Sequence, residues 1–358
     1  MGQITMEDLS ISDASFGLLL GAGASYEAGF PLMTDLTKAV IDNLSDSQVQ
    51  LIIELLNEDY DGSIDLTKGI PNIEVVADRI SIRAIKSGET GNGKYLDIIS
   101  DIRGAIVSII TSISNPNLNY HINMLQAFKR IRESVSAPLW IFTTNYDPLI
   151  ELAAAEVGVP VNDGFLGAGP LRFLDSRSLT SVSGSINGSH FEHRKGLQIN
   201  LVKLHGSIDW WSTKDGVHVP KVYSTVDQTR LRHPVVRTII FPQKSKVYET
   251  MDFPYDQFWR VASGTLGQGC KFLTTIGYSF GDEHINRTLL IPYLFNRKIK
   301  VSALLGFEPT NFEQLTEYAA FNFTSGSRTR LRGKISTEIS DIWKFSSFVR
   351  ELCTYAGI

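Results

Sequence analysis

Four short clusters of glycine, hydroxyl, amide, imidazole and carboxylate residues are the parts of this sequence best suited to chemistry. They read GAGAS at 21–25, TTNYD at 143–147, LHGS at 204–207 and GYSFGDEHIN at 277–286. Each ends a short apolar run that is typical of a buried strand. Because the carboxyl ends of parallel strands line one edge of a sheet, the four clusters are predicted to meet in a single ligand-binding cleft.

The first cluster is suited to binding a diphosphate. Its glycines allow backbone N–H groups to approach phosphate oxygens closely, and the dipole of the helix that follows favours negative charge. The spacing differs from the dehydrogenase fingerprint, because Tyr26 stands where a third glycine is expected. A tight strand-to-helix turn without a ligand is the alternative interpretation.

The next two clusters supply groups that act on a sugar or on a water. Asn145 can hold a ribose hydroxyl or a water through its amide donor and acceptor. His205 can take up a proton near neutral pH, as a general base does. The alternatives are structural: Asn145 and Asp147 cap the helix that Pro148 opens, and His205 is an ordinary packing residue.

The last cluster offers further contacts. Gly277 and Ser279 are candidates for a ribose or a phosphate, and Asp282 is a candidate ligand contact or the cap of the next helix. The stretch also matches the G-x-S-x-G nucleophile elbow, which needs an acid and then a histidine later in the chain. His284 is the only later histidine and lies too close to serve, so a serine hydrolase is disfavoured.

Composition and charge restrict the class of protein. The 358 residues carry a net charge of −4, so direct nucleic-acid binding is not expected. No apolar run approaches the roughly 18–20 residues of a membrane helix, and the first residues do not resemble a signal peptide. Two cysteines, Cys270 and Cys353, indicate a reducing compartment, and we expect a cytoplasmic protein. Without a C-x-x-C pair or an H-E-x-x-H motif, no metal site is expected.

Apolar periodicity predicts the elements that position these clusters. We expect an α/β fold, with a doubly wound, Rossmann-like parallel sheet and no zinc ribbon, in a single domain over 1–358. Its core is predicted to span 16–34 and 118–306. A helical module at 35–114 is inserted after the first strand–helix unit, and helices at 310–358 end the chain.

In this order, the four clusters resemble the motifs of the sirtuin superfamily. GAGAS resembles its first nucleotide loop, TTNYD its ribose motif, and LHGS its catalytic-histidine motif. GYSFGDEHIN resembles its later ribose-binding motif, in the form typical of the bacterial sirtuin-like branch. The motifs span residues 16 to 290, and the resemblance implies one sirtuin-like domain that uses NAD⁺ as its substrate.

Two departures separate the sequence from deacetylating sirtuins. Those enzymes carry a four-cysteine zinc module, which two cysteines cannot form. They also carry Pro-Asp-Phe-Arg after the first loop, whereas Pro31 is followed here by Leu32, Met33 and Thr34. Both point to the prokaryotic branch that the resemblance associates with NAD⁺ depletion in anti-phage defence (abortive infection). Members of that branch form homo-oligomers, and some work beside a separate ring ATPase of the HerA type or another phage-sensing partner.

The resemblance implies hydrolysis of the nicotinamide–ribose bond to nicotinamide and ADP-ribose. Asn145 is expected to orient the ribose and the attacking water, and His205 to accept a proton. The residues implied for NAD⁺ binding are Gly21, Ala22, Gly23, Ser25, Thr144, Asp147, Gly277, Ser279 and Asp282.

Three other functions remain open on the sequence. They are a non-catalytic sensor of NAD⁺ or ADP-ribose, an ADP-ribosyltransferase, and a subunit that is inactive without its partner. The sequence leaves undecided the activation trigger, the oligomer size, the partner's identity and the preference between NAD⁺ and NADP⁺. It also leaves undecided the roles of 162–196 and 211–241.

Overall fold

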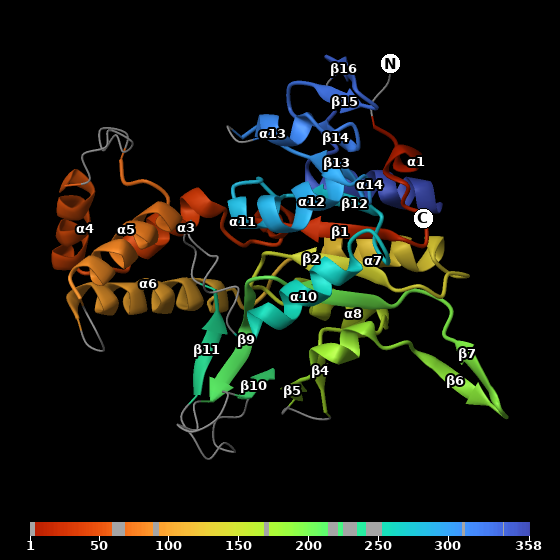
Figure 1. The fold of residues 1–358 in the computed structure, drawn as a ribbon, viewed down its shortest axis with the longest axis horizontal. Coiled ribbons are helices and arrows are strands. Elements are labelled where there is room, and N and C mark those ends of the chain that lie inside the picture. The colour runs from red at the N-terminus through yellow and green to blue at the C-terminus, as the bar shows by residue number, and fades with distance from the viewer. Residues whose placement is uncertain are drawn as a thin grey trace.

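A large, mostly parallel sheet stands at the centre of the chain, with helices on both faces (Figure 1). The structure is a computed structural model. It describes residues 4–58, 69–88, 93–167, 172–213, 221–224, 235–240, 253–309, 312–338 and 340–358.

The strands of the central sheet stand in an order that does not follow the chain. Across the sheet they are β16 (Lys334–Ser336), β15 (Thr329–Leu331), β14 (Phe321–Thr324), β13 (Lys300–Leu304), β12 (Phe272–Ile276), β1 (Phe16–Leu20), β2 (Leu139–Thr143), β8 (Ile199–Lys203) and β3 (Val161–Asn162). Strands β14 to β3 run parallel, and β15 and β16 form an antiparallel edge. The predicted α/β fold with a doubly wound parallel sheet is confirmed.

The sheet reverses its direction of growth beside β1. From β1 the chain builds outward through β2 and β8, and then crosses to the other side of β1 to form β12. The carboxyl ends are level, because Leu20 pairs with both Thr143 and Ile276, and Thr143 pairs with Lys203. Such a reversal opens a crevice at the carboxyl ends of the strands, where ligands bind in open α/β sheets.

Helices cover both faces because successive strand residues point in opposite directions. Leu18 and Leu20 enter one core, whereas Leu19 enters the other. The first core is closed by α1 (Met6–Leu9), α2 (Ala22–Tyr26), α7 (Asn119–Ile131), α8 (Leu149–Val157) and α14 (Phe345–Ala356). The second is closed by α10 (Tyr255–Thr265), α11 (Glu283–Ile285), the π-helical turn η4 (Asn286–Leu290), α12 (Ile291–Phe295) and α13 (Glu313–Thr316).

Four helices occupy the segment that we expected to be a helical module. They are α3 (Met33–Asp42), α4 (Asp46–Glu58), α5 (Ile73–Lys86) and α6 (Lys94–Thr111), and they lie together to one side of the sheet in Figure 1. Val40, Ile80 and Ile106 are buried in a core that these helices share. The side chains of Tyr146 and Ile208 pack against that core, so the module touches the segments that follow β2 and β8.

The two segments of undecided role contribute a second, antiparallel sheet. Its order is β11 (Val235–Ile239), β9 (Gly206–Thr213), β10 (Lys221–Ser224), β5 (Arg172–Leu174) and β4 (Phe165–Leu166). A short 3₁₀ helix, η2 (Ser176–Thr180), follows β5, and then β6 (Gly184–Asn187) and β7 (His190–His193) form an exposed hairpin. Residues 214–220, 225–234 and 241 of the second segment lie outside the described residues.

The expectation of helices alone at 310–358 is wrong. Residues 321–336 form β14, β15 and β16, and helices occupy only Glu313–Thr316 and Phe345–Ala356. Phe321 and Phe323 are buried in β14, where two-residue alternation outweighs any helical pattern. Arg332 and Gly333 both have positive φ values, which suits the two-residue turn between β15 and β16.

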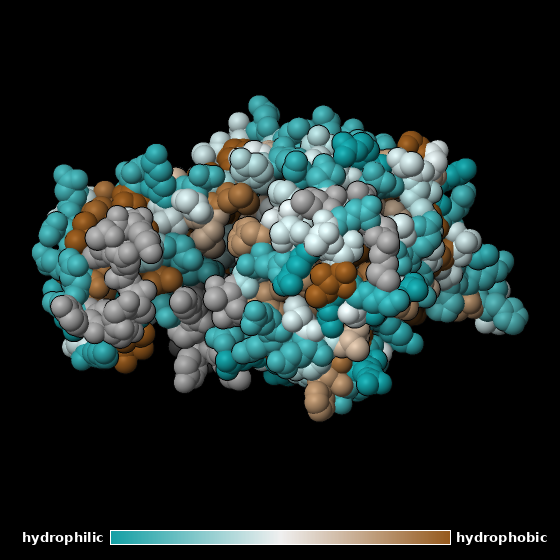
Figure 2. Space-filling model, turned by 90° about the horizontal axis from the view of Figure 1, so that it is seen from above, coloured by the Kyte–Doolittle hydropathy of each residue, from teal (hydrophilic) through white to brown (hydrophobic). Residues whose placement is uncertain are grey.

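The outer surface is predominantly hydrophilic on the face that Figure 2 shows, where hydrophobic residues form scattered patches. Among the residues that the structure describes, no helix combines the length and the apolar character needed to span a bilayer.

Candidate active site

The four clusters predicted from the sequence lie at the ends of four adjacent strands. GYSFGDEHIN follows β12, GAGAS follows β1, TTNYD overlaps the end of β2, and LHGS follows β8, in that order across the sheet. The strand ends that sequence reasoning selected therefore line one edge, at the reversal point where this kind of fold binds ligands.

Three glycines allow the ends of β1 and β12 to touch through their backbones. Gly21 N donates to Ile276 O at 3.0 Å, and Gly23 N donates to Gly277 O at 3.0 Å. A methyl group added at Gly23 would stand 2.7 Å from Gly277 Cα, which leaves no room for a side chain. The N–H groups of Gly21 and Gly23 were expected to face a diphosphate. Both instead donate to carbonyl oxygens at the end of β12.

Ala22 begins the short helix that follows β1. It is the first residue of α2, where a backbone N–H has no acceptor within the helix, and it is exposed. On the same edge Ser279 is exposed, and Thr144 is half-buried with its N–H donating to Leu20 O at 3.1 Å. These three residues leave polar groups on the solvent side of the strand ends.

Replacing Gly23 with alanine is expected to separate the ends of β1 and β12. The new methyl group would meet backbone atoms that cannot rotate away, and overpacking of this kind costs about 1–3 kcal/mol. We expect a lower melting temperature and weaker NAD⁺ binding, measured by thermal denaturation with and without NAD⁺. Gly104→Ala is the matched control, because a methyl group there meets nothing within 4 Å. Equal melting temperatures and equal NAD⁺ shifts for Gly23→Ala and wild type would contradict this role of Gly23.

Asn145, Ser25 and Asp147 form one hydrogen-bonded unit between the ends of β1 and β2. Asn145 Nδ2 donates to Gly21 O at 3.0 Å and to Ser25 Oγ at 2.8 Å. Ser25 Oγ donates to Asp147 Oδ2 at 2.7 Å, and the other oxygen of Asp147 accepts from Leu149 N at 3.2 Å. The Ser25 hydroxyl, expected at the diphosphate, is therefore hydrogen-bonded within the protein. Asp147 accepts from the first amide of α8, whose N-cap is Pro148.

The amide nitrogen of Asn145 is used within this unit, and its amide oxygen is the atom that could accept a hydrogen bond from a ligand. The two donor contacts fix the plane of the half-buried side chain, and Asn145 N donates to Thr143 Oγ1 at 3.0 Å. An amide held in this way presents its oxygen in a set direction, and an amide oxygen accepts hydrogen bonds from a hydroxyl or a water.

His205 lies beside a carboxylate from the far side of the cleft. Its Nε2 lies 3.0 Å from Asp282 Oδ2, and the two side chains are 5% and 8% exposed. The segments after β8 and β12 are separated by β1 and β2, a span of roughly 14 Å at the usual strand spacing. The contact therefore bridges the ends of both central strands, and it brings Asp282 to the imidazole of His205.

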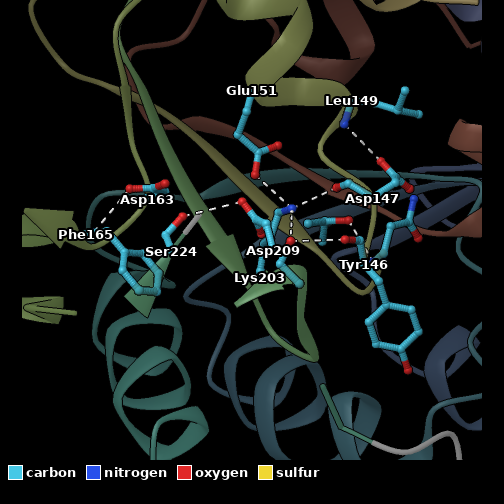
Figure 3. A network of polar contacts seen from close by, with 12 residues as sticks. Tyr146, Asp147, Leu149, Glu151, Asp163, Phe165, Lys203, Asp209 and Ser224 are labelled. Carbon is cyan, nitrogen blue, oxygen red and sulfur yellow. Dashed lines mark hydrogen bonds and ion pairs between the residues drawn. The ribbon is translucent and has the colours of Figure 1, made fainter. Parts of the chain in front are cut away.

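A buried lysine that sequence reasoning missed holds the strand ends together (Figure 3). Lys203 Nζ donates to Asp147 O at 2.7 Å and to Ser207 Oγ at 2.8 Å, and it lies 2.8 Å from Glu151 Oε1. Ser207 Oγ in turn donates to Tyr146 O at 3.0 Å. The lysine thus ties the segment that carries Asn145 to the segment that carries His205.

Charge balance around Lys203 determines its ionisation. Burial opposes the charge on Lys203, but Glu151, Asp209 and Asp147 outweigh burial and raise its pKa, so the ammonium persists. Burial also raises the pKa of Glu151 to about 7, against the opposing effect of Lys203. The signal in the sequence is a lysine inside the apolar run at 200–204, since a lysine is almost never fully buried unless it is paired.

The space beneath the Asn145 unit is too small for a dinucleotide. A cavity of about 10 Å³ is lined there by Ser25, His121, Asn145, Asp147 and Glu151, among others. Pockets for ligands of drug size measure roughly 300–1,000 Å³. Ala22, Thr144 and Ser279 do not line this cavity.

Comparison with known families identifies part of this site. Residues 140–291 match the family model described as the SIR2-like domain, which includes Asn145, His205, Gly277 and Asp282. The predicted resemblance to the sirtuin family is confirmed, and a SIR2-like domain fits NAD⁺-dependent activity in general. No curated protein matches the chain.

The metal chemistry of zinc-bearing sirtuins has no counterpart in the described residues. Cys270 is buried in the core behind β12, and Cys353 lies on α14. Within the described ranges, no three histidine, cysteine or acidic side chains lie close enough together to hold a metal ion.

Proposed function

We propose that this sirtuin-like chain is an NAD⁺ glycohydrolase, which releases nicotinamide and ADP-ribose from NAD⁺. The observation that carries the proposal is the arrangement of Asn145 and His205 at neighbouring strand ends of a SIR2-like domain. A protein that only binds a nucleotide needs phosphate and sugar contacts. It has no need for a buried imidazole paired with a carboxylate at the cleft.

The reaction is a substitution at the anomeric carbon of the ribose. Water adds to that carbon, the bond to the nicotinamide nitrogen breaks, and the electron pair neutralises the pyridinium. Because the leaving group departs neutral, the protein mainly has to position the reactants and stabilise a cationic sugar. Asn145 would accept a hydrogen bond from the ribose or the water, and His205 would take the proton that water loses.

Loss of the zinc module favours water over acyl-lysine as the acceptor. The chain has two cysteines, so it lacks the four thiolates of deacetylating sirtuins. We further propose that NAD⁺ depletion serves anti-phage defence, that the chain forms homo-oligomers, and that a separate sensing protein, of the ring-ATPase type or another, triggers it. These proposals rest on the resemblance of its motifs to the bacterial branch.

Purified protein incubated with NAD⁺ is expected to release nicotinamide and ADP-ribose in equal amounts, measured by liquid chromatography. NADP⁺ in a parallel reaction shows whether a 2′-phosphate is tolerated. Equal release excludes transfer to a macromolecule, because a transferase would leave ADP-ribose attached to its acceptor. Bound but intact NAD⁺, with no nicotinamide in the presence or absence of lysate from phage-infected cells, would contradict the proposal.

A further inference from the structure

The small cavity beneath the Asn145 unit has the size and the lining of a water site. Its volume is about 10 Å³, and most of the side chains that line it are polar. A cavity needs roughly 10–15 Å³ to hold one water, and polar cavities of this size hold water whereas apolar ones stay dry. The cavity therefore suits a single water molecule.

Two of the side chains that line this cavity each carry a buried polar atom in need of a partner. Within the part of the chain that the structure describes, neither His121 Nδ1 nor Glu151 Oε2 has a hydrogen-bond partner, and solvent reaches neither atom. His121 comes from α7 and is 2% exposed, and Glu151 comes from α8. Buried polar groups are nearly always hydrogen-bonded, and ordered water supplies the partner where the protein does not. Two such atoms on the wall of one cavity can share one partner.

The charges around the cavity favour a neutral occupant. The ammonium of Lys203 would repel a cation, and the carboxylates of Asp147 and Glu151 would repel an anion. A water carries no net charge, and it can donate to one neighbour while it accepts from another. Water is therefore the occupant that fits these walls.

The hydrogen-bond donors on the walls determine which way the water is oriented. The ammonium of Lys203 already has three acceptors and the side-chain amide of Asn145 has two. The hydroxyl groups of Ser25 and Thr143 each donate to one acceptor within the protein. The oxygen of a water in the cavity is thus left with one side-chain donor, the N–H of His121 when its proton is on Nδ1.

We propose that one buried water occupies this cavity, accepts a hydrogen bond from His121 Nδ1–H and donates one to Glu151 Oε2. Burial lowers the pKa of His121 to about 4, against the opposing effect of Asp147, so the imidazole is neutral and carries a single proton. The site goes beyond the proposed function, because it requires neither NAD⁺ nor turnover.

This water would extend the Lys203 network to another helix. Glu151 Oε1 lies 2.8 Å from Lys203 Nζ, as Figure 3 shows, and Lys203 Nζ donates to Asp147 O. With Glu151 Oε2 bonded to the water and the water bonded to His121, the network that joins the segments after β2 and β8 reaches α7. His121 is thus a structural member of the layer beneath the Asn145 unit.

A high-resolution crystal structure of the wild type at pH 8 tests the site. This pH lies above the pKa of about 7 of Glu151, so its carboxylate mainly accepts hydrogen bonds. We expect one ordered water within about 3.2 Å of both His121 Nδ1 and Glu151 Oε2. In protein labelled with ¹⁵N-histidine, His121 is expected to show the Nδ1–H form with slow hydrogen exchange. His190, on the exposed hairpin, is the reference for a ring that exchanges rapidly with solvent.

The substitution His121→Leu removes the donor and keeps about the same side-chain volume. We expect the water to be absent from its crystal structure, and the matched control His190→Leu to retain it. Should His121→Leu fail to fold, the wild-type structure and spectrum decide alone.

Several results would overturn the inference. They are a wild-type cavity without density, a metal ion in it, a direct contact between His121 and Glu151, or the Nε2–H form of His121. A water that stays in place in His121→Leu would overturn it as well. None of these results depends on nicotinamide release, so the failure of this inference and the failure of the proposed function are separate.

Discussion

Replacing His205 with asparagine is expected to lower kcat for nicotinamide release by a factor on the order of 10²–10⁴, the range for loss of a positioned general base. The imidazole is nearly buried and lies 3.0 Å from Asp282 Oδ2. Asparagine is smaller than histidine and keeps a polar, uncharged group beside that carboxylate, so the fold is expected to survive. It cannot take up the proton that water loses, and the rate therefore falls while NAD⁺ binding is kept.

The matched control for this variant is His190→Asn. His190 lies on the exposed hairpin of β6 and β7, away from the strand ends. The measurement is nicotinamide release at saturating NAD⁺, with melting temperature recorded for each protein. If His205→Asn kept more than about a tenth of the wild-type kcat, His205 could not be the base, since general bases contribute at least about 10²-fold.

Replacing Lys203 with methionine is expected to cause the largest loss of stability. Lys203 Nζ donates hydrogen bonds to Asp147 O and Ser207 Oγ and forms an ion pair with Glu151. The lysine side chain is 2% exposed. Breaking a buried ion pair by removing one partner costs about 3–5 kcal/mol. For a chain of this size, the melting temperature is expected to fall by on the order of 10 °C.

The pH dependence of that loss identifies its cause. The pKa of Glu151 is about 7 in the folded protein, above its usual value near 4.5, so its ionisation works against folding as pH rises from 4.5 to 7. Without the ammonium of Lys203 the pKa of Glu151 rises further, and this penalty extends to higher pH. The stability gap between wild type and Lys203→Met is therefore expected to be larger at pH 8 than at pH 6.

A second substitution tests whether the uncompensated carboxylate is responsible. Glu151→Gln in the Lys203→Met background is expected to recover part of the lost stability at pH 8, because it removes the charge that the lysine balanced. Urea unfolding of wild type, Lys203→Met, Glu151→Gln and the double variant, at pH 6 and pH 8, gives the coupling free energy between the two residues. Two results together would contradict this role of Glu151: a stability difference between wild type and Lys203→Met that does not change with pH, and no recovery of stability in the double variant.

The sheet and its binding edge were predictable because each strand and turn is encoded locally. The runs at 16–20 and 139–143 are apolar except for Thr143 and are buried at every position, as strands covered on both faces require. Each leads into a cluster of small or polar residues. Because parallel strands align their carboxyl ends, these local signals were enough to predict that Asn145 and His205 lie on one edge.

The roles of individual side chains were less predictable, because each depends on a contact between distant segments. The position of Ser25 in the glycine-rich turn predicts a phosphate contact, but its hydroxyl donates a hydrogen bond to Asp147, 122 residues away. Asp282 reads as a ligand contact, but it faces His205 across two strand ends. Lys203 was visible as a charge in an apolar strand, and only the fold identifies Glu151 as its partner.

The most direct test of the account is the structure of His205→Asn with NAD⁺ bound, since this variant is expected to bind the dinucleotide without cleaving it. The account predicts one NAD⁺ across the ends of β12, β1, β2 and β8, with its nicotinamide ribose beside the Asn145 amide and residue 205. A dinucleotide bound at another surface, with these strand ends vacant, would contradict it.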